Sequence, residues 1–193
     1  MVREACFYLF KINYTYQYST NLSFGNVFWL DLSVELLDYC NVIRLTGKRQ
    51  LELICRVAAK LIPNANLISL WRFGEHKQKV ISLINYDVEA QEFTEGLELN
   101  RRDFPVYFDA IVERELLVAS RARAHPVTSC FNESYFEPLD IHSLLDFILH
   151  KEFAPVGVIC CESKGAAVNW SDDDIENIRM LATQISYCFE LPC

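Results

Sequence analysis

Two apolar segments separated by a short polar link constrain the fold of this chain more than any other feature. Residues 143–149 and 156–161 are rich in aliphatic side chains and have the length of strands, and residues 151–154 join them. A link this short is typical of a β-hairpin. Residues 67–73 and 79–84 repeat the arrangement around a second polar link. The sequence therefore predicts an antiparallel sheet.

Helical periodicity is found mainly towards the two ends of the chain. Residues 31–44 and 48–62 carry apolar residues three or four apart, Pro105 opens a short helix, and a long helix begins after Ser171. Residues 116–119 add a lone strand. This order of elements predicts an α+β fold, with about five antiparallel strands and helices from both chain ends available to cover one face.

The last helix carries two separate signals. Ser171 and Asp174 have the spacing of a capping box, with Asp in place of the usual Glu. Apolar residues then recur every three or four positions, as in a coiled-coil seam. This stripe can pack on the sheet of its own monomer or against a second subunit. We expect a homodimer, with the interface residues Ile178, Ile185 and Phe189.

Charge and hydropathy exclude several classes of partner. The formal net charge is −8, which disfavours broad binding to nucleic acid or to an anionic membrane surface. No run of 18 apolar residues occurs that could cross a membrane as a helix. The apolar segment after Arg3 has no signal-peptide features, so a cytoplasmic protein is expected.

The eight cysteines are expected to be reduced. Cys40, Cys55 and Cys188 fall within helical periodicities, and Cys160 and Cys161 lie in an apolar strand, where thiols act as small hydrophobic side chains. No Cys-x-x-Cys pair occurs and no Cys/His cluster has zinc spacing, so no metal site is expected.

Two long segments between strands, 85–104 and 120–142, are predicted to roof a pocket over the open face of the sheet. In the second segment, Arg121, Arg123 and His125 alternate along what we interpret as extended chain, so their side chains can point to one side and clamp an anion. An anionic or carbonyl-rich small molecule is the expected ligand. The candidate pocket residues are Arg121, Arg123, His125, Tyr107, Tyr135, Ser143 and Asp146.

Structural explanations exist for the same residues. Asp146 lies in an apolar strand, where an unpaired carboxylate is costly, so Arg123 could pair with it instead of with a ligand. Tyr107 and Tyr135 could stack on a planar ligand or pack as a lid. His125 precedes Pro126, and we expect it to fix the loop by a hydrogen bond rather than to act as a catalytic base.

Five segments, taken in order, resemble the GAF family of sensor domains. They are DFPVYF (103–108), ASRARAHPVT (119–128), SYFEPLDIHSLLD (134–146), VGVICCE (156–162) and WSDDD (170–174). The resemblance implies one GAF domain over residues 29–191, preceded by an N-terminal appendage at 1–28. It also implies a central antiparallel sheet of five or six strands, in the order 2-1-5-4-3 counted from residue 67. The terminal helices would pack on one face and the pocket loops on the other.

The functional implication is a bacterial sensory domain that binds a small molecule. Such domains control an output domain, for example a diguanylate cyclase or a histidine kinase, through their terminal helices. The signature of the cyclic-nucleotide-binding members and the cysteine context of the bilin-binding members are absent here, and no haem or metal ligand set occurs. The resemblance therefore identifies neither a cofactor nor a ligand.

Two alternative functions remain open at this point. Some GAF-like proteins reduce free methionine sulfoxide with pocket cysteines, and Cys130 or Cys161 could serve such a reaction. Cys160 and Cys161, however, are adjacent in a strand and would point to opposite faces. The other alternative is a structural dimerisation module with a collapsed pocket.

Overall fold

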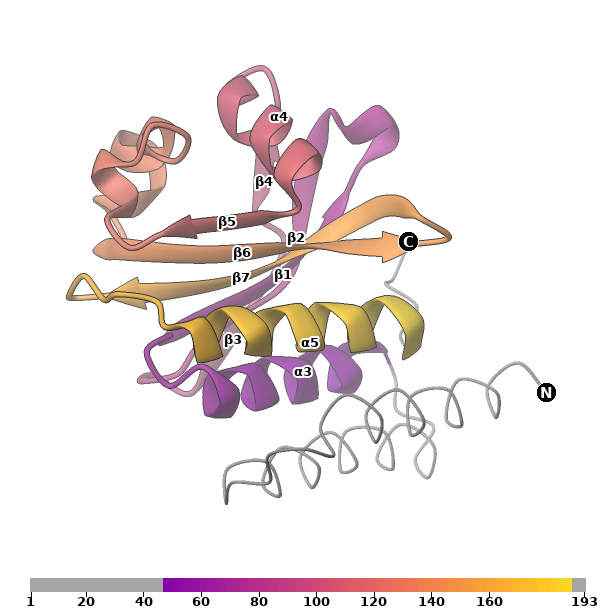
Figure 1. The fold of residues 1–193 in the computed structure, drawn as a ribbon, viewed down its shortest axis with the longest axis horizontal. Helices are drawn as coiled ribbons and strands as arrows, with labels where there is room; N and C mark the ends of the chain where they lie inside the picture. Colours follow the sequence, from indigo (N-terminus) through magenta and orange to yellow (C-terminus); the bar gives the residue numbers. More distant parts are fainter. Residues whose placement is uncertain (1–46, 189–193) are drawn as a thin grey trace. The chain divides into compact units, whose positions relative to one another are not determined.

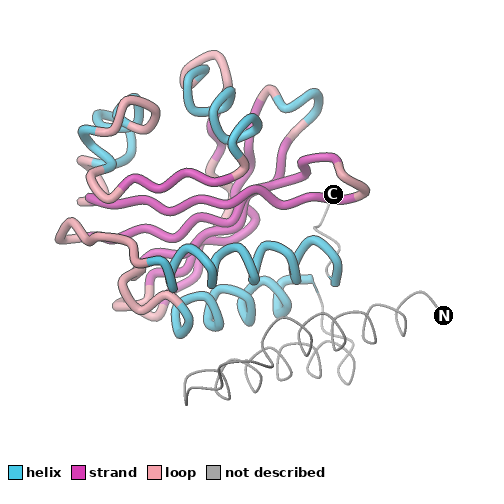
Figure 2. The backbone as a smooth tube through the Cα atoms, in the orientation of Figure 1, coloured by secondary structure: helices cyan, strands magenta, loops and turns pink. Residues whose placement is uncertain are grey.

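The structure is a computed structural model that describes residues 47–188, with the side chain of residue 188 excepted. A seven-stranded antiparallel sheet lies between two layers of helix (Figures 1 and 2). The predicted helix 31–44, the predicted appendage 1–28 and Phe189 lie outside the described residues. None of the described helices is long and apolar enough to cross a membrane.

The order of strands across the sheet is β3-β2-β1-β7-β6-β5, and β4 also pairs with β2. The five strands predicted from the sequence are β1, β2, β5, β6 and β7, and they lie across the sheet in the predicted order 2-1-5-4-3. That prediction is confirmed. The strands are β1 (Leu67–Phe73), β2 (Lys79–Asp87), β3 (Glu92–Thr94), β4 (Glu98–Asn100), β5 (Leu116–Ala119), β6 (Ile141–Lys151) and β7 (Ala154–Lys164).

The interpretation of residues 85–104 as a segment between strands was wrong in part. Strands β3 and β4 pair with opposite ends of β2, with Tyr86 opposite Phe93 and Val80 opposite Leu99. Each has three residues, which is too short to show an alternating pattern. Strands β6 and β7 are also longer than expected, and the turn between them shrinks to two residues.

Two helices cover one face of the sheet, α3 (Gly47–Leu61) and α5 (Asp172–Cys188) (Figure 1). They contact each other where the Asn177 side-chain amide donates a 2.9 Å hydrogen bond to the Leu61 carbonyl oxygen. The predicted capping box is confirmed. The Asp174 N–H donates to Ser171 Oγ at 3.1 Å, and the Ser171 N–H donates to Asp174 Oδ2 at 2.9 Å.

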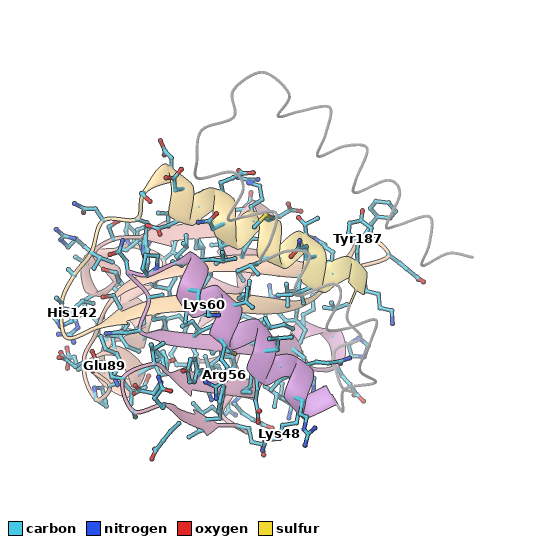
Figure 3. All side chains as sticks on the ribbon, turned by 90° about the horizontal axis from the view of Figure 1, so that it is seen from below. Lys48, Arg56, Lys60, Glu89, His142 and Tyr187 are labelled. Carbon is cyan, nitrogen blue, oxygen red and sulfur yellow. The ribbon has the colours of Figure 1, made fainter. Side chains whose placement is uncertain are left out.

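The apolar stripe of α5 lies inside the chain's own core. Ile178 and Ile185 are 0% and 1% exposed. Their assignment to a dimer interface was wrong, because side chains packed between helix and sheet have no surface to offer a second subunit. Tyr187, in contrast, is exposed and points away from the sheet (Figure 3).

The other face of the sheet is covered by α4 (Pro105–Arg114) and the helical turns η3 (Ser129–Phe131) and η4 (Asn132–Phe136). Phe131 holds this layer together, with its ring centroid 4.6 Å from that of Phe104 and 4.8 Å from that of Tyr107. Phe108 and Phe136 are fully buried beneath it. This aromatic layer is the roof of the cavity described next.

Candidate functional site

A small cavity lies between the roof and the sheet. Its volume is about 20 Å³, which is room for one or two waters. Its polar groups come from two acids, two tyrosines and one thiol, and the other walls are apolar. The lining residues are Trp71, Val80, Leu99, Tyr107, Phe131, Tyr135, Leu144, Asp146, Val158, Cys160 and Glu162.

Strand alternation places both acids on the floor of the cavity. Every second residue of a strand points to the same face, so Leu144 and Asp146 of β6 face the roof together with Cys160 and Glu162 of β7. The register pairs Asp146 with Cys160 and Leu144 with Glu162. The two carboxyl groups are therefore diagonal neighbours on adjacent strands.

Each acid is bound by a tyrosine of the roof. The Tyr107 hydroxyl, from α4, donates a 2.6 Å hydrogen bond to Asp146 Oδ2. The Tyr135 hydroxyl, from η4, donates a 3.0 Å bond to Glu162 Oε2. These two bonds link the roof to the floor through polar contacts in an otherwise apolar layer.

Burial dominates the electrostatics of the site. It raises the pKa of Asp146 to about 7, although the Tyr107 hydrogen bond acts in the opposite direction. Burial together with the charge of Asp146 raises the pKa of Glu162 to about 8. Burial likewise raises the pKa values of Tyr107, Tyr135 and Cys160, which stay protonated at neutral pH.

Asp146 is incompletely satisfied. Its side chain is fully buried, and its Oδ1 atom has no hydrogen-bond partner by distance and angle. The Cys160 thiol beside it, whose hydrogen bond lowers the pKa of Asp146, is only a weak donor. The nearby indole N–H of Trp71 cannot supply a hydrogen bond, because it donates to Ser69 Oγ at 2.7 Å. A buried carboxyl oxygen without a donor costs free energy, so this atom is a point at which a ligand could gain a contact.

The predicted pocket residues divide into two groups. Tyr107, Tyr135 and Asp146 line the cavity, whereas the basic residues and Ser143 do not. The interpretation of the segment 121–125 as extended chain was wrong, because residues 122–124 form a 3₁₀ turn that breaks the alternation. The arginines therefore do not converge on the cavity.

Arg123 has a structural role at the edge of the fold. Its Nε–H donates to the Ile141 carbonyl oxygen at 2.8 Å, and its Nη2 donates to the Phe136 carbonyl oxygen at 3.2 Å. It also pairs with Asp140 at 3.0 Å. The alternative of an Arg123–Asp146 salt bridge was therefore wrong as well, since the partner of Asp146 is Tyr107.

The remaining predicted residues are also engaged locally. Arg121 is exposed and donates to the Ser120 carbonyl oxygen at 2.8 Å. His125 Nδ1 accepts the N–H of Val127 at 3.3 Å, which confirms the expectation that it fixes the loop. Ser143 Oγ donates to the same Ser120 carbonyl at 2.9 Å.

Glu162 and Trp71 were not singled out as pocket residues from the sequence. The argument applied to Asp146, that a charged residue in an apolar strand needs a reason, applies equally to Glu162 in the run VGVICCE. Trp71 gave no such signal, because an aromatic residue is ordinary in a buried strand. No group of three or more potential metal ligands occurs within residues 47–188.

A family model for the GAF domain matches residues 48–189. The chain belongs to the GAF domain family. None of the curated proteins compared with the sequence matches it.

Solved structures with the same fold include a biliverdin-bound protein, a domain of a sensor histidine kinase and a reductase enzyme. The structure of JSC1_58120g3 in its far-red absorbing dark state, with bound biliverdin IXa, has a TM-score of 0.67 and 9% sequence identity. The match covers 81% of this GAF domain chain and 96% of that chain. The GAF domain of a two-component sensor histidine kinase from Bacillus halodurans has a TM-score of 0.56 and 18% sequence identity. The match covers 72% of this chain and 92% of that chain.

The enzyme is free methionine-R-sulfoxide reductase from Neisseria meningitidis, solved in complex with its substrate. It has a TM-score of 0.61 and 14% identity, with 89% of this chain and 93% of that chain covered. At these identities the likeness shows the fold alone.

Proposed function

We propose that this GAF domain is a sensory module in bacterial signal transduction, with its small-molecule site in the cavity between Asp146 and Glu162. The observation that carries the proposal is the unpartnered Oδ1 of Asp146, fully buried and on the wall of a cavity. Buried polar atoms are almost always satisfied, so an orphan in a cavity marks a place for a further group. The sensory proteins among the structural neighbours support this reading.

Ligand entry would require the roof to move. The cavity has room for little more than a water, and the Tyr107 and Tyr135 hydroxyls tie α4 and η4 to the floor. A ligand that offers its own donors to the two acids could replace these bonds. Binding would then shift the population from this closed form towards one with the roof raised.

Strand β6 offers a route from the cavity to the terminal helix. Asp146 faces the cavity, and its neighbour Phe147 lies on the opposite face, where the guanidinium of Arg179 in α5 stands 5.5 Å from its ring centroid. Four residues from Asp146, the His150 N–H donates to Ser186 Oγ of α5 at 3.0 Å. A displacement of β6 would therefore act on α5, through which we propose that an output domain is controlled.

Native mass spectrometry of the gently purified protein tests the proposal. We expect a bound small molecule, and hydrogen exchange in α4 and in residues 129–136 should then differ between the loaded and the empty protein, because the roof moves. Exchange in α5 should change as well. A ligand that protects other segments and leaves these unchanged would contradict the proposed site.

The cavity argues against the anionic ligand expected from the sequence. The arginines that motivated that expectation do not line it, and two carboxyl groups do. An anion placed beside Asp146 and Glu162 would meet their negative charge whenever either is ionised.

Thiol redox chemistry receives less support from the geometry. A nucleophilic cysteine needs a lowered pKa, and burial raises the pKa values of Cys130, Cys160 and Cys161. Cys160 lines the cavity, whereas Cys161, next to it in β7, points to the opposite face of the sheet. We therefore propose a sensory and not a catalytic role.

A further inference from the structure

We infer that the ligand of this cavity carries a small cationic nitrogen group, such as a primary ammonium, which binds between Asp146 and Glu162. The inference rests on the proposed function, because it names the chemical class for the same site. Asp146 Oδ1 is buried, unpartnered and on the cavity wall, and it can accept a hydrogen bond. A protonated amine supplies three donors from a compact charged group.

Within residues 47–188, every titratable group that lines the cavity beside the acids is neutral or negative. Tyr107 comes from α4, Tyr135 from η4, and Cys160 lies beside Glu162 on β7. Strand β1 contributes Trp71, which has no charge, and β2 and β4 contribute aliphatic side chains. The described lining thus contains two acids without a basic partner. Buried charges in proteins are normally paired, so a ligand cation that displaces a proton from either acid would form the ion pair that this lining otherwise lacks.

The apolar walls define what else the ligand can carry. Trp71 and Phe131 present aromatic surface, which attracts a desolvated cation through the ring faces. Val80, Leu99 and Val158 complete an aliphatic lining. The present volume suits an ammonium-sized head, and an attached apolar group would need the raised roof.

Cation binding should also release protons. Burial holds the pKa of Asp146 at about 7 and that of Glu162 at about 8, so near neutral pH Glu162 of the empty site is largely protonated and Asp146 is about half protonated. A bound ammonium favours the ionised carboxylates and lowers both pKa values. The observed binding enthalpy should then vary with the ionisation enthalpy of the buffer.

The test compares three small probes of different charge, methylammonium chloride, methanol and sodium acetate, at constant ionic strength and pH 7.5. The indole N–H resonance of Trp71, assigned with the Trp71→Phe variant, reports from the cavity wall. Methylammonium should shift this resonance along a saturating curve, with a dissociation constant in roughly the millimolar range, because the probe is so small. Methanol and acetate should bind at least tenfold more weakly.

Two variants locate the probe. Asp146→Asn preserves the shape and should weaken methylammonium binding at least tenfold, and Glu162→Gln should do the same. Asp140→Asn is the matched control, because Asp140 is an exposed acid that pairs with Arg123 outside the cavity. It should leave the curve unchanged.

The outcomes separate the two proposals. If methanol or acetate saturates the Trp71 shift as readily as methylammonium, the cation inference is overturned and the cavity remains the binding site. If methylammonium leaves Trp71 unmoved, the inference is likewise overturned. The native mass spectrum and the exchange pattern then decide separately whether the proposed function stands.

Discussion

The Tyr107 hydroxyl and the Asp146 carboxyl form a 2.6 Å hydrogen bond that joins helix α4 to the floor of the cavity. The bond is made to one oxygen of the carboxyl group, and the other oxygen has no partner. Tyr107 is itself buried among the roof aromatics. This contact holds the roof in the closed position and stabilises the charged form of a buried acid.

Replacing Tyr107 by Phe should destabilise the fold in a pH-dependent way. The change removes the hydroxyl donor of the buried Asp146 carboxyl, which costs about 1–3 kcal/mol in free energy of unfolding. The loss should be greater at pH 8.5 than at pH 5, because the bond favours the ionised carboxyl. Urea denaturation at both pH values measures it. Tyr187→Phe is the control, since Tyr187 is exposed, and an equal loss in both variants would contradict the assignment.

The pH dependence of stability should identify the buried acids. Their pKa values in the folded state, about 7 for Asp146 and about 8 for Glu162, lie above the ordinary values of 3.8 and 4.5. At a pH between its unfolded-state pKa and its folded-state pKa, each acid is ionised in the unfolded chain and still protonated in the folded chain. The free energy of unfolding should therefore fall as pH rises from about 4 to 8, by up to about 1.4 kcal/mol per pH unit for each acid.

Asp146→Asn should remove the Asp146 part of this slope. The amide has no charge to desolvate, so the variant should be more stable than the parent at pH 8 and close to it at pH 4. Asp140→Asn should leave the slope between pH 5 and 8 as it is, because the pKa of Asp140 is lowered by its hydrogen bonds to His142 and Arg123. A flat profile for the parent chain would contradict the raised pKa values.

The sequence predicted the sheet well and the chemistry of its cavity less well. Hairpins and apolar periodicity depend on neighbouring residues, so strands such as 67–73 could be located from the sequence. The 3₁₀ turn at residues 122–124 depends on contacts with distant segments, such as the Arg123 bond to the Ile141 carbonyl. Tyr107 and Asp146 were each noted, but their pairing spans 39 residues and no local pattern indicates it.

Arg123→Ala should destabilise the fold through lost backbone contacts. Two carbonyl oxygens, of Phe136 and Ile141, lose a charged donor, at a cost of roughly 2–4 kcal/mol. Asp140→Asn should cost much less than Arg123→Ala, because Asp140 is exposed and its ion pair is screened by solvent. Thermal denaturation of both variants measures the difference. Adding Asp146→Asn should not restore the stability of Arg123→Ala; restoration would mean that the two side chains interact after all.

The β6–β7 turn offers a stabilising substitution. Glu152 and Phe153 have φ angles of 51° and 64°, a left-handed conformation that side chains disfavour, and Phe153 is 98% exposed. Asn-Gly is the sequence that such two-residue turns prefer, so the double replacement should stabilise the fold by about 1–2 kcal/mol. Phe153→Ser is the control, because it removes the ring and keeps the backbone strain. If Phe153→Ser raises the free energy of unfolding as much as Asn-Gly does, the gain comes from removing the exposed ring and not from relieving the backbone strain.

The exposed side of α5 is where a homodimer contact remains to be tested. Ile185 is buried in the chain's own core, so Ile185→Asp should cost more than about 4 kcal/mol and abolish cooperative unfolding. Tyr187→Asp changes an exposed neighbour on the same helix and should leave the melting temperature within a few degrees of the parent. We expect the parent chain to sediment as a dimer at a protein concentration of roughly tens of micromolar, and Tyr187→Asp to weaken the dimer. A folded, monomeric Ile185→Asp variant would instead place that residue at the subunit contact.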